Sequence, residues 1–472
     1  YFPGLVSHLG GLEIEDIASR AEEHARFAEA RHAEGGRFRS YTFKEHPRGK
    51  EGERHGMTAA RSKLIHKLVR ETGMGLDDTG LYEEYLKLED LAAPVNVRDL
   101  LALRRADAPL AEEQVEPAER ILPRFGSGAM SFGAISAESQ RDIFEAMREI
   151  GGRSNSGEGG ENPFYFTNGI SASAKQVASA RFGVTAEYLM AGKEFQIKIA
   201  QGAKPGEGGQ LMGVKVSEEI ARARYAMPGT DLISPPPLHD IYSIEDLKEL
   251  IYELRQLNPA AKVNVKLVSG AHIGMIAVGV AKAGADIIHV SGGNGGTGAA
   301  SVSSMRHAGL PWEFGLLEVH NALKANGLRD RVILRVDGGL STGRDLVIGA
   351  VQGAQEFEFG KLLLIAEGCI MARICEKNTC PTGIATHDPK FAAKYKGQKE
   401  HVVNLMRILA RDVRRNLALM GFDSLENVVG RTDLLQVNPV HKEIIAARRL
   451  DLSAFAPSKQ EGDGPEAADS VA

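Results

Sequence analysis

The only three cysteines of the chain lie within one short segment, GCIMARICEKNTCPTG, as Cys369, Cys375 and Cys380. A single zinc ion prefers closer pairs and a fourth ligand, for which His387 is a weak candidate, and one disulfide would leave a thiol over. Cysteine-rich loops of this kind, often with a proline after the last cysteine, hold iron–sulfur clusters. Three thiolates favour a three-iron cluster, or a four-iron cluster with an open or foreign fourth site. Buried, inert thiols are the alternative.

Glycine-rich segments follow several of the expected strands. They are SNSGEGGEN, AQGAKPGEGGQ, SGGNGGTGA and DGGLSTGRD, and the last strand runs into GKLLLIAEGC. Each alone is typical of a turn, but several on one rim let the backbone approach a phosphate closely. The phosphate would meet amides near Gly338, Gly339, Gly360 and Lys361, where two helices are expected to begin. Flavin mononucleotide (FMN) suits such a rim, with its ring across the mouth and its tail between these loops.

Strands and amphipathic helices alternate from about residue 124 onward. The expected strands are 126–131, 152–156, 194–200, 231–234, 262–268, 286–291, 331–337 and 356–360. Eight such units in about 240 residues are typical of a TIM barrel. A doubly wound sheet would also alternate, but no GxGxxG follows the first strand. We therefore expect an α/β protein with a TIM (β/α)8 barrel, preceded by a smaller, mainly helical and mixed N-terminal region.

Composition and charge exclude several classes of protein. With 57 Lys+Arg and 62 Asp+Glu the net charge is −5, which gives no electrostatic reason to expect nucleic-acid binding. No apolar run approaches the roughly 18 residues of a membrane span, so we expect no membrane role. Three cysteines are too few for a disulfide framework, which favours a cytoplasmic protein. The chain begins Tyr1-Phe2-Pro3 without an initiator methionine, so we expect a processed or dissected product.

The motifs resemble a known family when taken together and in order. SGAMSFGAIS, SNSGEGGE, QGAKPGEGGQL, ISPPPLHDIYSIEDL, GGTGA, DGGLSTG and GCIMARIC with CPTG occur between about Val115 and Asp433. They resemble the FMN-binding synthase domain of the glutamate synthase large subunit. GGLEIEDIASRAEEHARF and the stretch through Asp99 bear a weaker likeness to the end of its central domain, and LDLSAF to the start of its C-terminal β-helix domain.

The resemblance implies three regions along the chain. Residues 1–118 would correspond to the end of the central domain. Residues 119–435 would form the FMN-binding barrel, with an iron–sulfur loop at 369–383. Residues 436–472 would be a C-terminal extension, whose acidic tail we expect to be disordered.

The resemblance also implies an activity, the reductive amination of 2-oxoglutarate and ammonia to L-glutamate through 2-iminoglutarate. Reduced FMN would deliver the hydride. A [3Fe-4S] cluster on Cys369, Cys375 and Cys380 would relay electrons from an NADPH-oxidising flavoprotein subunit or from ferredoxin. Such an oxidoreductase of nitrogen metabolism is expected to be an oligomer.

Residues of the substrate site are carried over from the family motifs. Gln201, Lys204 and Arg224 match positions that grip 2-oxoglutarate, and a dicarboxylate needs a cation for each carboxylate. Lys204 would also polarise the keto oxygen or protonate the forming amine. Either Glu158 or Glu161 would receive ammonia or help deprotonate it, and the sequence does not choose between them.

Flavin contacts are carried over in the same way. Met130 and Ser131 would touch the ring, and Lys266, or Lys198 in its place, would bring a cation to the N1–O2 edge. The ribityl chain and phosphate would be held by Ser291, Gly296, Thr297, Asp337, Gly338, Gly339 and Gly360.

One departure from the family pattern concerns the source of ammonia. No cysteine precedes Cys369, so this chain lacks the nucleophile that hydrolyses glutamine in the complete subunit. Ammonia would then be free, or come from another segment or a separate glutaminase chain. Two alternatives stay open: an N-methylglutamate synthase-type FMN subunit, and a non-catalytic electron-relay subunit.

Overall fold

The computed structural model of this 472-residue chain describes residues 9–11, 13–33, 56–71, 80–90, 94–236, 240–300 and 302–457. The expected acidic tail and residues 237–239 of the ISPPPLHD motif lie outside the described residues. The chain divides into two compact units. One comprises Tyr1–His55, Ala93–Arg104 and Arg431–Ala472, and the other comprises Gly56–Ala92 and Arg105–Gly430.

The smaller unit is built from short elements distant in sequence. Strand β1 (Leu101–Leu103) pairs antiparallel with β11 (Leu435–Val437). Helix α1 (Ile14–Ala33) begins near the C-terminal segment, because Arg449 forms ion pairs with Glu13, at 3.2 Å, and with Asp16. Helix α17 (Lys442–Ala447) belongs to the same unit.

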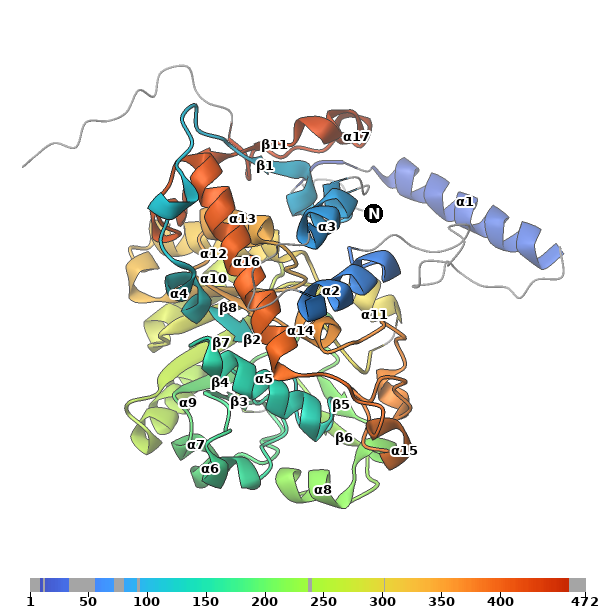
Figure 1. The fold of residues 1–472 in the computed structure, drawn as a ribbon, viewed down its shortest axis with the longest axis vertical. Helices are drawn as coiled ribbons and strands as arrows, with labels where there is room; N and C mark the ends of the chain where they lie inside the picture. Colours follow the sequence, from blue (N-terminus) through green and yellow to red (C-terminus); the bar gives the residue numbers. More distant parts are fainter. Residues whose placement is uncertain are drawn as a thin grey trace, which may run out of the picture. The chain divides into compact units, whose positions relative to one another are not determined.

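The larger unit contains a parallel seven-stranded sheet (Figure 1). The neighbours in order are β2, β10, β9, β8, β7, β4 and β3, and every pair is parallel. Their bounds are Phe125–Ser127, Glu356–Phe359, Ile333–Asp337, Ile287–Ser291, Lys262–Val268, Glu194–Lys198 and Ala174–Val177.

The segment 153–155 joins the two edges of this sheet. Gly126 of β2 bridges to Arg153, and Asn155 bridges to Ala174 of β3, both in the parallel sense. The sheet therefore closes into a ring with eight positions, and the prediction of a TIM (β/α)8 barrel is confirmed.

One of the eight strands was assigned wrongly from the sequence. Residues 231–234 do contain a strand, β6 (Leu232–Ser234), but it pairs antiparallel with β5 (Gly209–Leu211) outside the barrel. The third barrel strand is β3, which reads AKQV and carries two polar residues in four. Hydrophobicity alone does not mark so short and polar a strand.

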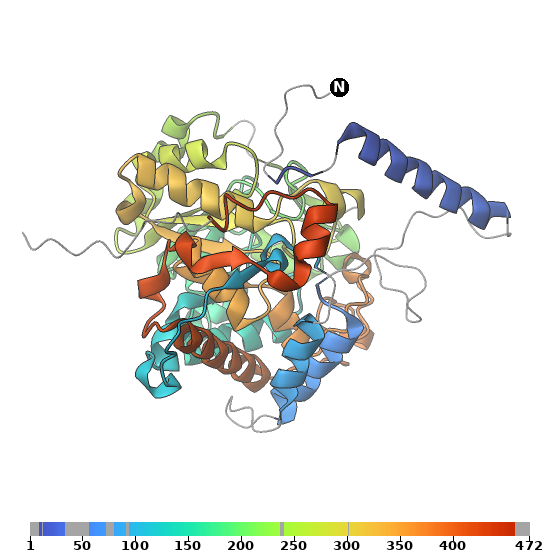
Figure 2. The same ribbon diagram turned by 90° about the horizontal axis from the view of Figure 1, so that it is seen from above.

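Helices surround the barrel and cover its outer face (Figure 1). In the second view the paler blue pair α2 and α3 stands beside the long helix α16 (Figure 2). Among the described residues, no helix combines the length and apolar character that crossing a membrane requires. The helices of this unit are α2 (Ala59–Glu71), α3 (Leu81–Asp90), α4 (Ala118–Ile121), α5 (Ala137–Glu149), α6 (Phe164–Asn168), α7 (Ala186–Met190), α8 (Glu218–Arg224), α9 (Ile244–Leu257), α10 (Ile273–Ala283), α11 (Val302–His307), α12 (Trp312–Ala325), α13 (Gly343–Val351), α14 (Lys361–Ala366), α15 (Pro389–Ala392) and α16 (Lys399–Met420).

Polar and apolar residues alternate along the barrel strands. Gln196 of β4 bonds to His289 of β8, and Arg335 of β9 bonds to Glu194 of β4, although these strands are not neighbours. The polar side chains therefore meet inside the ring, and the apolar ones face the helices. The buried apolar set is Phe195, Ile197, Val263, Val265, Ile288, Val290, Leu334, Val336 and Phe357.

A cluster of charges lies within this polar interior. Arg335 is fully buried and pairs with Glu194 at 2.6 Å, Glu356 at 2.6 Å and Glu358 at 3.0 Å. Burial opposes its charge, but Glu194 and the other carboxylates outweigh burial and raise the pKa of Arg335 well above its usual value. The barrel interior is therefore held by ion pairs as well as by strand hydrogen bonds.

Candidate active site

The carboxylate of Glu158 lies at the centre of a polar group at the barrel mouth. It follows the segment 153–155 and accepts from Lys198 Nζ at 2.6 Å and from Gln201 Nε2 at 3.3 Å. Lys198 ends β4, so the two strand ends bring these side chains together. A Cβ at Gly209 would come within 1.9 Å of Glu158 Oε1, so only glycine leaves room for the carboxylate.

Burial weakens the charge of the lysine in this group. It lowers the pKa of Lys198, although Glu158 acts in the opposite direction. The charge of Glu158 also reaches two further cations, Lys204 and Arg224. Glu158 therefore interacts with Lys198, Lys204 and Arg224, all predicted from the sequence for substrate or flavin. Gln201 bonds to the same carboxylate.

Lys204 and Arg224 are both almost fully buried, with exposed fractions of 2% and 4%. Lys204 Nζ donates to the carbonyl of Ala299, and burial lowers the pKa of Lys204. Arg224, the last residue of α8, donates from Nη2 to Ser131 Oγ at 3.3 Å and to Phe132 O at 2.9 Å. Burial lowers the pKa of Arg224 to about 10, so it remains charged at neutral pH.

The Nε atom of Arg224 is buried and has no hydrogen-bond partner within the described chain. An unsatisfied buried donor on a cation costs free energy, and an anion that accepts from it removes this cost. The residues present therefore fit a carboxylate ligand.

Glu161 lies in a different environment, although it is only three residues from Glu158. It pairs with Lys175 at 2.7 Å, and both side chains have 0% exposure. Ser171 Oγ donates to it at 2.7 Å and Ala172 N at 3.0 Å. Its contacts hold the loop to β3, and none of them faces the cations at the mouth.

The residues predicted to hold FMN gather around Asp337, at the end of β9. Lys266 Nζ lies 2.6 Å from Asp337 Oδ2, and Ser291 Oγ donates to Oδ1 at 2.5 Å. Burial opposes the charge of Asp337, but Lys266 and His289 hold its pKa far below the usual range. Lys266 also stands beside Lys198 in strand register, so both candidate flavin cations come from neighbouring positions.

The predicted phosphate rim has close backbone packing. Gly338 and Gly339 have φ of +126° and +87°, which favours glycine, and a Cβ at Gly338 would lie 2.9 Å from Gly292 Cα. A Cβ at Gly128 would lie at an ordinary van der Waals distance, 3.4 Å, from Gly360 Cα, so the loop after β2 is adjacent to the start of α14. At Gly338 the backbone leaves no room for a side chain, which fits a rim that a phosphate approaches.

The remaining flavin candidates lie on the loops beside this rim. Met130 O accepts from Gln140 Nε2 at 3.1 Å, which fixes the loop after β2. Thr297 Oγ1 accepts from Ala299 N at 3.3 Å. A Cβ at Gly296 would lie 3.4 Å from Lys361 Cγ, so this glycine is next to the start of α14.

The first turn of α13 is occupied by a carboxylate of the protein. Asp412 of α16 accepts from Gly343 N at 2.6 Å, and Thr342 Oγ1 accepts from Asp345 N at 3.2 Å. A carboxylate at a helix N-terminus takes the position that a phosphate would otherwise prefer. A ligand phosphate would therefore lie nearer the glycines that precede the helix.

The three cysteines are free thiols in a loop of unusual backbone. Met371, Arg373 and Asn378 all have φ between 56° and 58°, a conformation that non-glycine residues adopt rarely. Burial, together with the neighbouring Cys375 and Cys380, raises the pKa of Cys369 to about 11. All three thiols therefore lie within electrostatic reach of one another.

The loop does not fit a single zinc ion. Among the described residues, the three cysteines do not form a group whose sulfur atoms all lie within 4.8 Å of one another. His387, the candidate fourth ligand, instead lies with Nε2 3.1 Å from Ile135 O and packs its ring against Phe132.

Lys215 connects this loop to the barrel mouth and was missed from the sequence. Its Nζ donates to Ala134 O at 2.9 Å and to Cys375 O at 3.3 Å, and the side chain is buried. A Cβ at Gly298 would lie 3.5 Å from Cys375 Cβ. The cysteine loop is thus adjacent to the segment that carries Gly296, Thr297 and Ala299. The only signal for Lys215 was a lysine between the valines of GVKV.

Comparison with known proteins covers this whole site. Residues 57–423, from α2 to beyond the cysteine loop, match the family described as the conserved region in glutamate synthase. The chain belongs to the glutamate synthase family. The family resemblance seen in the sequence motifs is therefore confirmed.

Named members of the glutamate synthase family match most of this chain. Ferredoxin-dependent glutamate synthase 2 of Synechocystis is 47% identical over 92% of this chain and 30% of its own length. The glutamate synthase [NADPH] large chain of Azospirillum brasilense is 50% identical over 96% and 29%. This chain therefore spans about 30% of the length of these relatives. A mandelate oxidase crystal structure aligns at 14% identity and a TM-score of 0.46, over 80% of this chain and 98% of its own, too distant to bear on function.

Proposed function

We propose that this chain carries the synthase site of a glutamate synthase. It would convert 2-oxoglutarate and ammonia to L-glutamate through 2-iminoglutarate. The observation that carries the proposal is a pair of buried cations, Lys204 and Arg224. Both interact electrostatically with the carboxylate of Glu158. Family membership supplies the chemistry that this arrangement fits.

Lys204 and Arg224 would each bind one carboxylate of 2-oxoglutarate, and the unpartnered Nε of Arg224 supports this role. Gln201 would donate to the bound substrate from beside Glu158. Lys204 would also give a proton to the keto oxygen as ammonia adds and water leaves. Because its pKa is lowered by burial, Lys204 releases a proton more readily than an exposed lysine.

Glu158, rather than Glu161, would accept the proton that ammonia loses. Glu158 lies with Lys198 and Gln201 at the mouth, whereas Glu161 is closed off with Lys175. Ammonia loses two protons in forming the imine, and the keto oxygen gains two and leaves as water, so the condensation balances with Glu158 accepting a proton and Lys204 donating one. The imine carbon then takes up a hydride and the nitrogen a proton to give the amino acid.

Two cofactors would complete the site. FMN, when bound and reduced, supplies the hydride, and a [3Fe-4S] cluster supplies electrons one at a time. Met130, Ser131, Lys266 and Lys198 would border the ring. Ser291, Gly296, Thr297, Asp337, Gly338, Gly339 and Gly360 would hold the tail, and Cys369, Cys375 and Cys380 would hold the cluster.

The partners and domain limits follow from the same proposal. Residues 119–435 would be the synthase barrel, residues 1–118 the end of the preceding domain, and 436–472 the start of a following segment. The electron donor would be ferredoxin or an NADPH-oxidising subunit, the donors named for relatives. Ammonia would be free or come from a glutaminase segment or chain.

The test is an anaerobic reoxidation experiment with the purified chain. The bound flavin is reduced chemically, and 2-oxoglutarate and ammonium are added separately and then together while flavin absorbance is followed. Reoxidation that needs both additions and yields glutamate supports the proposal. Reoxidation with methylammonium but not ammonium would favour the N-methylglutamate synthase type, and no reoxidation with either amine would contradict a synthase site that uses free ammonia.

A further inference from the structure

A chain of buried side chains crosses the barrel from the Glu158 loop to Lys266. It starts at the backbone N–H of Gly157, which donates to Asn155 Oδ1 at 3.0 Å. Asn155 Nδ2 lies 3.0 Å from Gln196 Oε1, and Gln196 Nε2 lies 3.2 Å from His289 Nδ1. His289 Nε2 lies 3.3 Å from Asp337 Oδ2.

The direction of every bond in this chain is fixed by its first member. A backbone N–H can only donate, so Asn155 Oδ1 accepts and Asn155 Nδ2 must donate to Gln196. Gln176 Nε2 also points at Gln196 Oε1, at 2.7 Å, which leaves Gln196 Nε2 as the donor to His289. If the Gln196 amide were reversed, its NH2 group would face two other donors, Asn155 Nδ2 and Gln176 Nε2.

His289 is consequently held in one tautomer. Because Nδ1 accepts from Gln196, the ring proton is on Nε2 and faces Asp337. Nε2 approaches Asp337 Oδ2 at 3.3 Å without the alignment of a full hydrogen bond, and it has no hydrogen-bond partner in the part of the chain that the structure describes. Asp337 Oδ2 also receives Lys266 Nζ, so the ring and the ammonium meet on one carboxylate oxygen.

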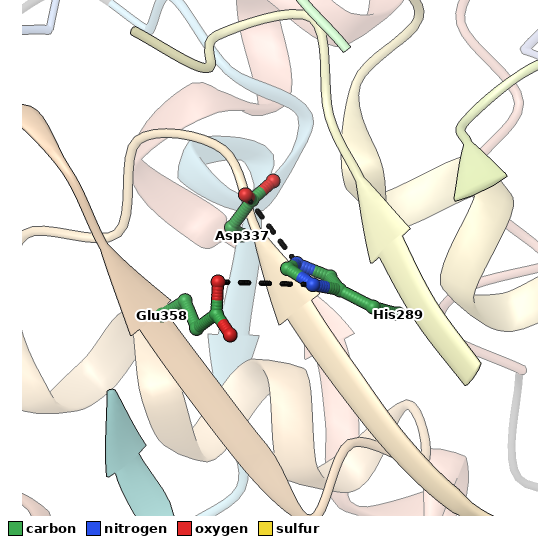
Figure 3. Close-up of side chains that lie close together, drawn as sticks. All are labelled: His289, Asp337 and Glu358. Carbon is green, nitrogen blue, oxygen red and sulfur yellow. Dashed lines mark ion pairs between the residues drawn. The ribbon is translucent and has the colours of Figure 1, made fainter. Parts of the chain in front are cut away.

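Figure 3 shows the His289 ring between Asp337 and Glu358, a trio whose ligand atoms are close enough for a metal ion. The two carboxylates face opposite ring nitrogens, with Glu358 Oε2 3.7 Å from Nδ1. A metal would need a ring lone pair, but Nδ1 already accepts from Gln196 and Nε2 bears the proton. Lys266 and Arg335 already pair with these two carboxylates. The trio therefore fits a hydrogen-bond relay and not a metal site.

We propose that His289 is a positioning residue that fixes Lys266 through Asp337 and couples it to the loop that carries Glu158. This inference rests on the proposed function, in which Lys266 lies at the flavin edge. Without the N–H of His289, less of the negative charge on Asp337 is neutralised by its neighbours. Asp337 holds Lys266 more tightly to itself, so the reduced flavin loses stabilisation relative to the oxidised form.

The test compares His289→Gln with His289→Leu in the FMN-loaded chain. Glutamine can accept from Gln196 and donate to Asp337, whereas leucine can do neither. We expect His289→Leu to lower the preference for reduced over oxidised FMN about tenfold, a shift of about 30 mV to more negative potential for two electrons. His289→Gln should stay close to the wild-type potential. An unchanged potential in His289→Leu, or equal shifts in both variants, would overturn the proposal.

A second measurement needs neither a leucine variant nor bound flavin. Long-range ¹H–¹⁵N correlation spectra of histidine-labelled chain report which ring nitrogen carries the proton, and His289→Gln identifies the His289 signals by their loss. We expect the neutral form with the proton on Nε2. A proton on Nδ1, or on both nitrogens, at neutral pH would refute the relay even if His289→Leu does not fold. Failure of the wild-type chain to bind FMN would count against the proposed function, while this spectrum would still test His289.

Discussion

Glu158 and Glu161 lie three residues apart on one loop and pair with different lysines, Glu158 with Lys198 at 2.6 Å and Glu161 with Lys175 at 2.7 Å. The first pair is at the barrel mouth beside Gln201, and the second is closed to solvent. One carboxylate is placed to act on a ligand, and the other to hold the loop.

Replacing each glutamate with glutamine separates these roles. We expect Glu158→Gln to lower turnover with ammonium about 10²-fold, because general-base assistance is lost. Glu161→Gln should instead lower the free energy of unfolding by about 3–5 kcal/mol, since Lys175 is left buried without its counter-charge. Urea unfolding and turnover per folded molecule distinguish the two. Equal losses of turnover in both folded variants would contradict the assignment.

Lys204 should govern binding of the keto acid and its pH dependence. Burial lowers the pKa of Lys204, so its charge is lost as pH rises, starting below the range of an exposed lysine. Affinity for 2-oxoglutarate should therefore fall with increasing alkalinity. Lys204→Ala should keep FMN bound but lose 2-oxoglutarate-dependent reoxidation of the flavin. Flavin reoxidation at the wild-type rate in this variant would remove Lys204 from the site.

Cys375 should be required for iron but not for flavin. We expect Cys375→Ser to lose the cluster iron while the FMN content stays that of the parent chain, because the flavin candidates bond through other loops. Iron analysis and electron paramagnetic resonance of the oxidised protein measure the cluster iron. Flavin absorbance measures the FMN content. Full iron content in the variant would show that this thiol is not a ligand.

His320 should make the barrel less stable in mild acid. Its Nδ1 accepts from Arg329 Nε at 3.1 Å, and burial, with the charge of Arg329, lowers the pKa of His320 to about 4. The unfolded chain, with a pKa near 6.5, binds more protons between these values, so stability falls as pH drops from about 6.5 to 4. The loss is about 3 kcal/mol by linkage.

His320→Gln, which keeps an acceptor for Arg329, is the matched control for this effect. Urea midpoints at several pH values should fall less steeply in the variant than in the parent chain. Parallel pH profiles for the two proteins would rule out His320 as the titrating group.

Much of the fold could be predicted from the sequence because the barrel strands are regularly spaced and end in glycine-rich loops. The strand 262–268 was predicted with the bounds it has in the structure. β3 was missed because it is short and half polar, and Lys175 is paired with a residue of an earlier loop. A polar side chain buried against a distant partner leaves no local pattern to read.

The candidate site was predictable only where motifs named its residues. Lys204 and Arg224 came from such motifs, but the separation of Glu158 from Glu161 depends on which lysine each one meets in space. His289 and Lys215 have no distinguishing neighbours in the sequence. Their surroundings depend on groups 93 and 160 positions away, the side chain of Gln196 and the backbone carbonyl of Cys375.

The polar lining of the barrel also restricts how its strands can pair. If β9 slipped by one residue against β8, Arg335 and Asp337 would turn into the apolar layer beneath the helices, and Leu334 and Val336 would enter the ring among unpaired carboxylates. Apolar interiors tolerate such errors better, because one aliphatic side chain can replace another. Here a misaligned strand would bury uncompensated charge, so electrostatics selects the correct alignment as the barrel closes.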